Sequence, residues 1–274
     1  MAVNKRGQPG DFRLAVDVGN THTVLGLFKG REILRSWRVA TRKDTTVDEI
    51  AFWLRGLADQ DTQSVSKAAL ASVVPTQDEP WLAALEEVFG IRPQVLDWRN
   101  CLGLKLDYEI PRQIGADRIA NVLGAHALGI KAGVVIDFGT ATTFDVFVKD
   151  AYLGGVICPG IQSGMRSLAQ NTAKLAEAEL QWPKMAVGRN TDDAMRIGVL
   201  KGTAGMVEYL LREILKETGL GKKQAMVLAT GGLAFWMRGR VSAIQRFEPD
   251  LTLMGINHLL SSKAVNGEKR RSLK

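Results

Sequence analysis

The stretch LAVDVGNTHTVLGLF at residues 14–28 recurs in altered form as VVIDFGTATTFDVF at residues 134–147. Aligning Asp17 with Asp137 also superposes a glycine two positions later and a threonine six positions later. Each copy is typical of a buried strand, a turn with a carboxylate, glycine and small polar residues, and a second strand. One such turn occurs in many β-hairpins. A copy in each half of the chain instead predicts two related units whose facing hairpins clamp phosphate.

The composition is that of a globular protein long enough for two domains. The chain has 274 residues, of which 46% are hydrophobic and 24% charged, with a net charge of +7. Much of the positive excess lies near the two ends, and no basic helix face carries interleaved aromatic residues, so we do not expect nucleic acid as a partner. Since the sequence has neither a run of eighteen apolar residues nor a signal-peptide core, we expect a cytoplasmic protein without a membrane span.

The cysteines and histidines do not form a recognisable framework. Cys101 and Cys158 are the only two cysteines, too few for a disulfide scaffold, and we interpret both as structural thiols. His22, His126 and His258 lie far apart and show no metal-ligand spacing, so we do not expect a zinc site.

The first hundred residues have the pattern of one α/β layer. After the first hairpin, residues 32–40 alternate as a half-buried strand, and residues 47–57 carry apolar side chains at helical spacing behind a threonine cap. A strand at 68–74, a helix at 81–89 and a short strand at 93–97 follow. This order of three strands and then alternating helices and strands predicts a sheet covered by helices.

The second half of the chain repeats this plan. A linking stretch at 104–110 leads to a helix whose first turn contains Asp117, and the second hairpin follows it. The remaining predicted elements are a strand at 152–160, helices at 161–180 and 191–218, a strand at 225–229, a glycine turn at 230–232, a helix start at 233–238 and a closing helix at 249–260.

The long helix at 191–218, for which Thr191 is the predicted cap, contains three glycines. Gly198, Gly202 and Gly205 each cost roughly 1 kcal/mol relative to alanine in a helix interior. Close approach of another helix would explain this cost. That helix would belong either to the same chain or to a partner copy.

The phosphate-binding features differ from the common nucleotide motifs. The sequence contains no GxxxxGK[ST] loop, and no GxGxxG motif follows a strand. Glycine at each hairpin turn would instead let backbone N–H groups of Asn20, Thr21 and Thr140 approach phosphate oxygens. Asp17 and Asp137 stand at strand ends where they could hold cations, and a nucleotide triphosphate brings Mg²⁺ with it.

Asp117 and Arg118 suit phosphoryl transfer to an alcohol. One carboxylate oxygen of Asp117 can accept the hydroxyl proton and aim the oxygen at phosphorus, while the planar fork of Arg118 can pair with a substrate carboxylate. The alternatives are a helix-capping aspartate and a surface arginine. For His22, contact with a phosphate and simple exposure at a turn both remain open.

Taken in order, the motifs DVGNTHT, GADR, DFGTATTFD, GGVICPG and TGG resemble those of type III pantothenate kinases, from about residue 14 to residue 260. That family belongs to the superfamily of acetate and sugar kinases, Hsp70 and actin. The resemblance implies an α/β fold of two ribonuclease-H-like domains, 14–115 and 116–265, with a nucleotide cleft between them. We expect residues 1–13 to form a disordered extension and residues 266–274 a basic tail. The implied activity is ATP-dependent phosphorylation of pantothenate to 4′-phosphopantothenate, the first step of coenzyme A synthesis.

The resemblance also implies a role for each motif residue. Asp117 is the expected catalytic base, Asp137 the ligand of a monovalent cation (K⁺ or NH₄⁺), and Asp17 a direct or indirect partner of the Mg²⁺ that accompanies ATP. The residues expected to bind ATP and its phosphates are Asp17, Val18, Gly19, Asn20, Thr21, His22, Thr23, Val24, Thr140, Gly231 and Gly232. Those expected to bind pantothenate are Tyr108, Gly115, Ala116, Asp117, Arg118 and Thr191. A homodimer whose interface lines the pantothenate pocket is implied as well.

Two other functions fit parts of the pattern. A non-catalytic accessory or regulatory protein could use the same scaffold, although the chain keeps Asp17, Asp117 and Asp137. A kinase for another small alcohol or a sugar is the second alternative, because phosphate loops do not define the acceptor. A panel of acceptor substrates separates these possibilities.

Overall fold

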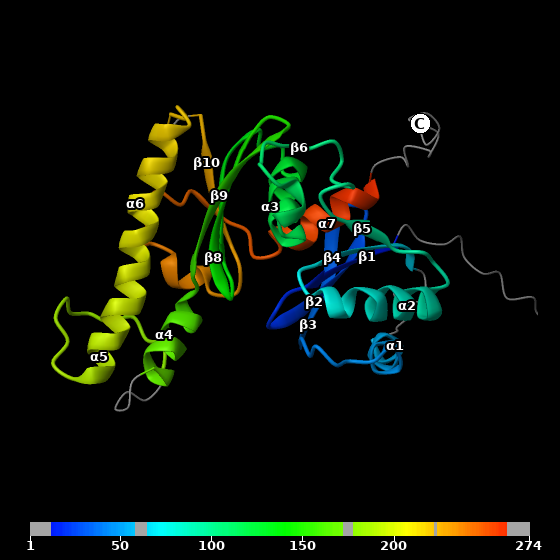
Figure 1. Ribbon diagram of the computed structural model, residues 1–274, viewed down its shortest axis with the longest axis horizontal. Helices are drawn as coiled ribbons and strands as arrows, with labels where there is room; N and C mark the ends of the chain where they lie inside the picture. The colour runs from blue at the N-terminus through cyan, green and yellow to red at the C-terminus, as the bar shows by residue number, and fades with distance from the viewer. Residues whose placement is uncertain (1–11, 58–64, 172–177, 222–223, 262–274) are drawn as a thin grey trace, which may run out of the picture. The chain divides into compact units, whose positions relative to one another are not determined.

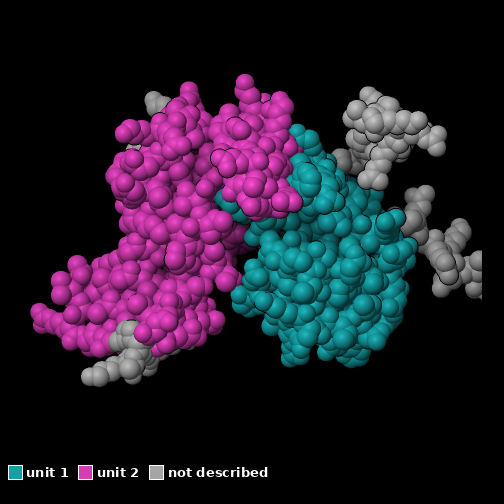
Figure 2. Space-filling model, in the orientation of Figure 1, with its two compact units in different colours: residues 1–103, 115–124, 253–274 teal, residues 104–114, 125–252 magenta. Residues whose placement is uncertain are grey.

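The computed structural model describes residues 12–57, 65–171, 178–221 and 224–261. The expected basic tail and all but the last two residues of the expected N-terminal extension lie outside these ranges. The chain forms two compact units (Figure 2): unit 1 comprises residues 1–103, 115–124 and 253–274, and unit 2 comprises residues 104–114 and 125–252. The domain limits expected from the sequence, 14–115 and 116–265, stay a prediction.

Unit 1 is built on a five-stranded sheet with the strand order β3-β2-β1-β4-β5. Adjacent strands among β1, β2 and β3 are antiparallel, while β4 runs parallel to β1 and β5 parallel to β4. The strands are β1 (Phe12–Val18), β2 (His22–Lys29), β3 (Glu32–Ala40), β4 (Val65–Ser72) and β5 (Gln94–Leu96).

Helices cover both faces of this sheet. Helices α1 (Val47–Gly56) and α2 (Asp78–Phe89) pack on one face, where Ile50 and Leu85 join a core with Val16 and Leu25. A capping box between Thr46 and Glu49 fixes the start of α1. On the other face lies α7 (Leu251–Ser261), and α3 (Ala116–Ala127), which begins in unit 1, packs against α7.

Helices α3 and α7 approach closely because they meet at a glycine. A Cβ atom at Gly255 of α7 would overlap the carbonyl oxygen of Ala120 in α3. A Cβ atom at Gly26 of β2 would lie 3.0 Å from Leu253 Cδ1. These contacts hold α7 between the sheet and α3, the helix that carries Asp117.

Unit 2 repeats the topology of unit 1. Its six-stranded sheet has the order β11-β10-β7-β8-β9-β6, and β7, β8 and β9 form the antiparallel meander that β1, β2 and β3 form in unit 1. Strands β10 and β11 extend it in parallel, as β4 and β5 do. The strands are β6 (Lys105–Leu106), β7 (Ala132–Phe138), β8 (Ala141–Val148), β9 (Ala151–Pro159), β10 (Met226–Thr230) and β11 (Arg246–Phe247). The duplicated hairpin is thus part of a duplicated sheet, to which unit 2 adds β6 parallel to β9.

The helices of unit 2 include the long helical region that contains Gly198, Gly202 and Gly205 (Figure 1). It consists of α5 (Thr191–Arg196), a π-helical segment η4 (Ile197–Lys201) and α6 (Gly202–Glu217). Leu200, Val207 and Leu211 bury one side of it in a core with β7 and β10. Two shorter helices are α4 (Ile161–Gln170) and the 3₁₀ turn η5 (Ala234–Met237), and 3₁₀ turns also occur at η2 (Pro75–Gln77) and η3 (Pro111–Gln113).

Three predictions for these helices are wrong in part. The cap of α5 is Asn190, whose side chain accepts a hydrogen bond from Asp193 N at 2.8 Å, and Thr191 is the first helical residue. The helix expected at 161–180 ends at Gln170, and residues 178–180 are irregular; residues 172–177 lie outside the described ranges. The region expected to be one α-helix at 191–218 consists of two α-helices, α5 and α6, which the π-helical segment η4 joins.

The three helix glycines do not contact another of the described helices. Gly198, Gly202 and Gly205 are exposed, and no neighbouring atom of the described chain lies within 4 Å of where their Cβ atoms would stand. Packing among the residues that the structure describes therefore does not explain them.

The cysteines are both free thiols, Cys101 buried and Cys158 half-buried. Burial raises the pKa of the Cys158 thiol, which makes it a poor nucleophile at neutral pH. None of the described helices combines the length and hydropathy of a membrane-spanning segment. Across the described ranges, no three His, Cys, Asp or Glu side chains cluster as a metal site would require.

Candidate active site

The first hairpin forms a tight turn directly after β1. Gly19 N donates a hydrogen bond to His22 O at 3.1 Å, and a Cβ atom at Gly19 would lie 2.9 Å from that oxygen, so the turn requires glycine. Asn20, Thr21 and His22 are exposed at its tip, while Asp17 is half-buried at the end of the strand. Burial and the nearby positive charge of Arg38 lower the pKa of His22. The lowered pKa keeps His22 neutral at neutral pH, so it adds no positive charge to the turn.

Thr41, just after β3, holds this hairpin in place. Its backbone N–H donates to Thr21 O at 3.0 Å, and its hydroxyl lies 2.9 Å from the hydroxyl of the buried Thr23. None of the sequence motifs indicated Thr41. The only signal for it was its position at the end of the predicted third strand.

The GADR motif forms the first turn of α3. Gly115 O accepts hydrogen bonds from Arg118 N at 3.1 Å and Ile119 N at 3.2 Å, which places Asp117 at the helix start as expected. A Cβ atom at Gly115 would overlap Asp117 Oδ1 and lie 3.3 Å from Val73 Cγ1. Glycine thus leaves room for the carboxylate.

Unit 1 brings this motif and the first hairpin to one corner. Val73, which touches the Gly115 position, donates its backbone N–H to Val18 O at 3.0 Å. Val18 is the last residue of β1 and follows Asp17 directly. Because Gly115 neighbours Val73, the Asp117 turn lies beside the end of β1.

Two opposing influences set the pKa of Asp117. The residue keeps some solvent contact, yet burial of its carboxyl group is the larger influence and raises the pKa. The hydrogen bond from Arg118 N to Asp117 Oδ1, 2.8 Å long, and the positive charge of Arg118 lower it less. Asp117 therefore accepts a backbone N–H, as a capping aspartate would, but its raised pKa also makes it a stronger base than an exposed aspartate.

Arg118 is 5% exposed, so its interpretation as a surface cation is wrong. A buried guanidinium needs compensating partners, and the carboxylate next to it in the chain provides one electrostatic partner. Burial therefore fixes the Arg118 side chain within unit 1, close to Asp117, the candidate base.

The second hairpin has the same construction in unit 2. Gly139 N donates to Ala141 O at 3.0 Å, and Thr140 is exposed at the tip. Ser163 Oγ, in the first turn of α4, donates to Thr140 O at 2.6 Å. The backbone of this turn is therefore held by α4.

The glycine turn after β10 packs against Asp137. Gly231 has a φ of +90°, and a Cβ atom there would overlap Asp137 Oδ1 and lie 2.7 Å from the backbone carbon of Phe138. Leu233 N donates to Phe138 O at 3.2 Å, and Gly232 is exposed. Thr230 pairs with Asp137 in the strand register, and its buried hydroxyl has no hydrogen-bond partner among the described residues.

The other expected pantothenate contacts, Tyr108 and Thr191, belong to unit 2, whereas Gly115 to Arg118 belong to unit 1. The Tyr108 ring lies 6.3 Å from the Tyr152 ring and next to Gly154. Thr191 begins α5 with an exposed side chain.

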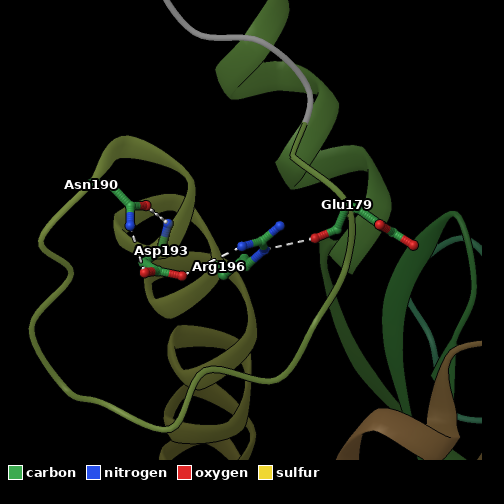
Figure 3. A network of polar contacts seen from close by, with 4 residues as sticks. All are labelled: Glu179, Asn190, Asp193 and Arg196. Atoms are coloured by element: carbon green, nitrogen blue, oxygen red, sulfur yellow. Dashed lines mark hydrogen bonds and ion pairs between the residues drawn. The ribbon is translucent and has the colours of Figure 1, made fainter.

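A network of polar contacts fixes the chain around Thr191 (Figure 3). Asn190 Nδ2 donates to Asp193 Oδ2 at 2.8 Å, and Asp193 Oδ1 lies 3.4 Å from Arg196. Arg196 Nε donates to the backbone oxygen of Glu179 at 2.8 Å, so the start of α5 is tied to residues 178–180.

Comparison with known proteins decides the family. The profile of "Type III pantothenate kinase" matches residues 13–213. The chain belongs to the type III pantothenate kinase family. Kinases of this family use ATP to phosphorylate pantothenate in coenzyme A biosynthesis. The family, the fold class and the function that the motifs implied are thereby confirmed.

Curated relatives match over most of their length. A type III pantothenate kinase from Desulfosudis oleivorans is 39% identical over 254 residues, covering 91% of this chain and 98% of the relative. One from Thermus thermophilus is 41% identical over 247 residues, covering 89% of this chain and 96% of the relative. The similarity thus includes both units and both hairpins.

Solved structures show the same fold in more distant proteins. A Baf family protein from Campylobacter jejuni has a TM-score of 0.58 at 20% identity and covers 90% of this chain and 96% of its own. The ROK hexokinase from Thermus thermophilus has a TM-score of 0.55 at 14% identity, with 90% and 97% covered. At these identities the likeness concerns the fold, the actin-like α/β architecture, and not the acceptor.

Proposed function

We propose that Asp117 is the general base with which this pantothenate kinase transfers the γ-phosphoryl group of ATP to the 4′-hydroxyl of pantothenate. The observation that carries the proposal is the position of Asp117. It lies in the first turn of α3, beside the end of β1, with a pKa raised by burial. A carboxylate in this state accepts a hydroxyl proton and orients the oxygen for in-line attack.

The two hairpins and the glycine turn would bind ATP. Phosphoryl transfer passes through a loose transition state, so the protein chiefly positions the groups and stabilises negative charge. In unit 1, residues 17–24 offer the backbone donors of a glycine turn held by Thr41. In unit 2, Thr140 would contact the phosphates, and Gly231 and Gly232 would face the adenosine side.

The residues around Asp117 would bind pantothenate. Arg118 would pair with the pantothenate carboxylate through its planar fork, and Gly115 and Ala116 would line the site beside it. Tyr108 and Thr191 would be further pantothenate contacts, as the motifs imply. The ordered start of α5, tied through Arg196 to Glu179, supports a fixed position for Thr191.

The residues around Asp137 suit a monovalent cation. The absent Cβ of Gly231 leaves space against Asp137 Oδ1, and the buried hydroxyl of Thr230 lies on the paired strand. Oxygen donors of this kind fit K⁺, which would neutralise negative charge next to the phosphates. Asp17, at the end of β1, would interact with the Mg²⁺ that ATP carries.

The homodimer is supported by one face of the long helix. Gly198, Gly202, Gly205 and Tyr209 follow one another at helical spacing, and all four are exposed. Small residues on a helix face let a second helix approach closely, and an exposed aromatic side chain adds buried apolar area on association. We infer that a second copy of the chain covers this face.

Replacing Gly202 with leucine is expected to weaken the dimer without unfolding the chain. Leucine has a higher helix propensity than glycine by about 1 kcal/mol, and no neighbouring atom of the described chain lies within 4 Å of where its Cβ would stand. Sedimentation velocity should therefore show monomer at concentrations where wild type is dimeric. The control is Gly56→Leu, at the exposed end of α1, which should leave the dimer intact. If the Gly202→Leu protein stays dimeric, α6 does not form the dimer interface.

The pH at which activity falls in acid should lie above the ordinary pKa of an aspartate. The base must be ionised, and burial raises the pKa of Asp117, so kcat/KM should fall as the pH decreases through that raised value. The measurement is kcat/KM for pantothenate at saturating ATP, from neutral to acid pH. A fall at about pH 3.9, the pKa of an exposed aspartate, would exclude Asp117 as the titrating base.

A panel of acceptors tests the substrate assignment. Purified protein is incubated with ATP, Mg²⁺ and K⁺, and ADP formation is followed with pantothenate, several sugars and acetate. Turnover with pantothenate alone supports the proposal, while turnover with a sugar would favour the alternative kinase. DNA or protein binding without turnover would favour the accessory role.

A cytoplasmic location stays a prediction.

A further inference from the structure

A row of paired residues crosses the sheet of unit 1 beside the phosphate turn. In the strand register Asp17 of β1 pairs with Val24 of β2, and Val24 pairs with Arg38 of β3. Directly paired side chains stand on the same face of a sheet. Asp17 and Arg38 therefore share one face, two strand spacings or about 10 Å apart.

This face is the one that α7 covers. Leu25, which neighbours Val24 in β2, and Trp37, which neighbours Arg38 in β3, contribute to the opposite core with α1 and α2. Side chains alternate between the faces along a strand, so Arg38 stands on the side where Gly26 meets α7. Arg38 is thus on the same side of the sheet as Asp117.

The charge of Arg38 is available to a ligand. Its side chain is exposed, and none of the ion pairs found among the described residues includes it. Its positive charge already acts on the hairpin tip, because it contributes to the lowered pKa of His22. Thr41, three residues later, ties the same strand to the turn through Thr21.

We propose that Arg38 binds the phosphate groups of the nucleotide and stabilises them next to the turn of residues 17–24. The inference rests on the proposed ATP-dependent kinase activity and adds a residue that the motifs did not indicate. Besides the carboxylate of Asp17, the turn itself offers backbone donors and side chains without positive charge, since the pKa of His22 is lowered. A guanidinium fork at the edge of the turn would supply the cation that polyphosphate binding favours.

The test compares three variants of the full-length protein. Arg38→Gln removes the charge, Arg38→Lys keeps the charge without the fork, and Arg31→Gln removes the same charge from the exposed opposite end of the β2–β3 hairpin. For Arg38→Gln we expect KM for ATP to rise about tenfold, with KM for pantothenate unchanged. Arg38→Lys should recover part of the loss, and Arg31→Gln should match wild type.

Direct binding separates this inference from the assigned activity. Calorimetric titration with Mg·ADP reports nucleotide affinity whether or not any acceptor is phosphorylated, and a weaker affinity of Arg38→Gln supports the proposal. Equal affinity and equal KM for ATP in Arg38→Gln and wild type would overturn it. A rise confined to KM for pantothenate would also overturn it, since Arg38 would then bind the acceptor. If wild type does not phosphorylate pantothenate but Arg38→Gln still binds Mg·ADP more weakly than wild type, only the kinase assignment is contradicted.

Discussion

Asp117→Asn is expected to lower kcat by about two to four orders of magnitude while the protein stays folded. Asparagine fills the same space next to Gly115 and Val73 but accepts no proton at neutral pH. The loss should appear in kcat at saturating ATP and pantothenate, measured by ADP formation. The matched control is Asp48→Asn, which changes an exposed aspartate in the first turn of α1 and should keep wild-type activity.

The same substitution should not lower stability. Burial raises the pKa of Asp117 above its unfolded value, so its contribution to stability is fully present below the unfolded pKa and is lost as the pH rises through the folded pKa. At neutral pH the buried carboxylate is therefore a cost that asparagine removes. Thermal unfolding at neutral pH should give Asp117→Asn a midpoint equal to or above that of wild type, and the difference should shrink in acid. Near wild-type turnover, or a large fall in the midpoint, would refute this role for Asp117.

Gly231→Ala is expected to destabilise unit 2 by about 3 kcal/mol or more, the largest stability effect that we predict for the site. Its φ of +90° disfavours any side chain, and the added Cβ would lie 2.7 Å from the backbone of Phe138 and overlap Asp137 Oδ1. Backbone atoms of a buried strand cannot move aside cheaply. Activity should fall as well, because Asp137 is displaced.

The control for that substitution is Gly239→Ala. Gly239 also has a positive φ, +71°, but no neighbouring atom of the described residues lies within 4 Å of its Cβ position. Its cost should be the conformational penalty alone, about 1 to 2 kcal/mol. Denaturant titrations of both variants separate the two causes. Equal losses for Gly231→Ala and Gly239→Ala would show that close packing against Asp137 contributes nothing.

The sheets could be predicted from the sequence because their signals are local. The apolar runs before Asp17 and Asp137 and the glycine turns after them mark two hairpins, and the repeat marks two related units. The structure extends this to the whole strand order, which is the same in both sheets apart from β6. Strand β6 has only two residues, and its pairing with β9 depends on contacts that no local pattern reports.

The missed features depend on contacts between segments distant in sequence. Thr41 lies next to Thr21 and Thr23 only after the meander has folded, and Arg118 is buried by surroundings that its own helix does not reveal. Two further differences shift a helix by about one residue. They are the π-helical segment η4 and the cap at Asn190 instead of Thr191. Helix boundaries vary by one or two residues, so the apolar pattern does not predict such shifts.

The most direct test of the central claim is identification of the product. Wild-type protein is incubated with ATP, Mg²⁺, K⁺ and pantothenate, and mass spectrometry follows the acceptor beside a parallel reaction with Asp117→Asn. We predict conversion of pantothenate to 4′-phosphopantothenate, with one ADP formed per product, and almost none with Asp117→Asn. Unmodified pantothenate in the wild-type reaction, or equal conversion by the folded Asp117→Asn protein, would contradict the account.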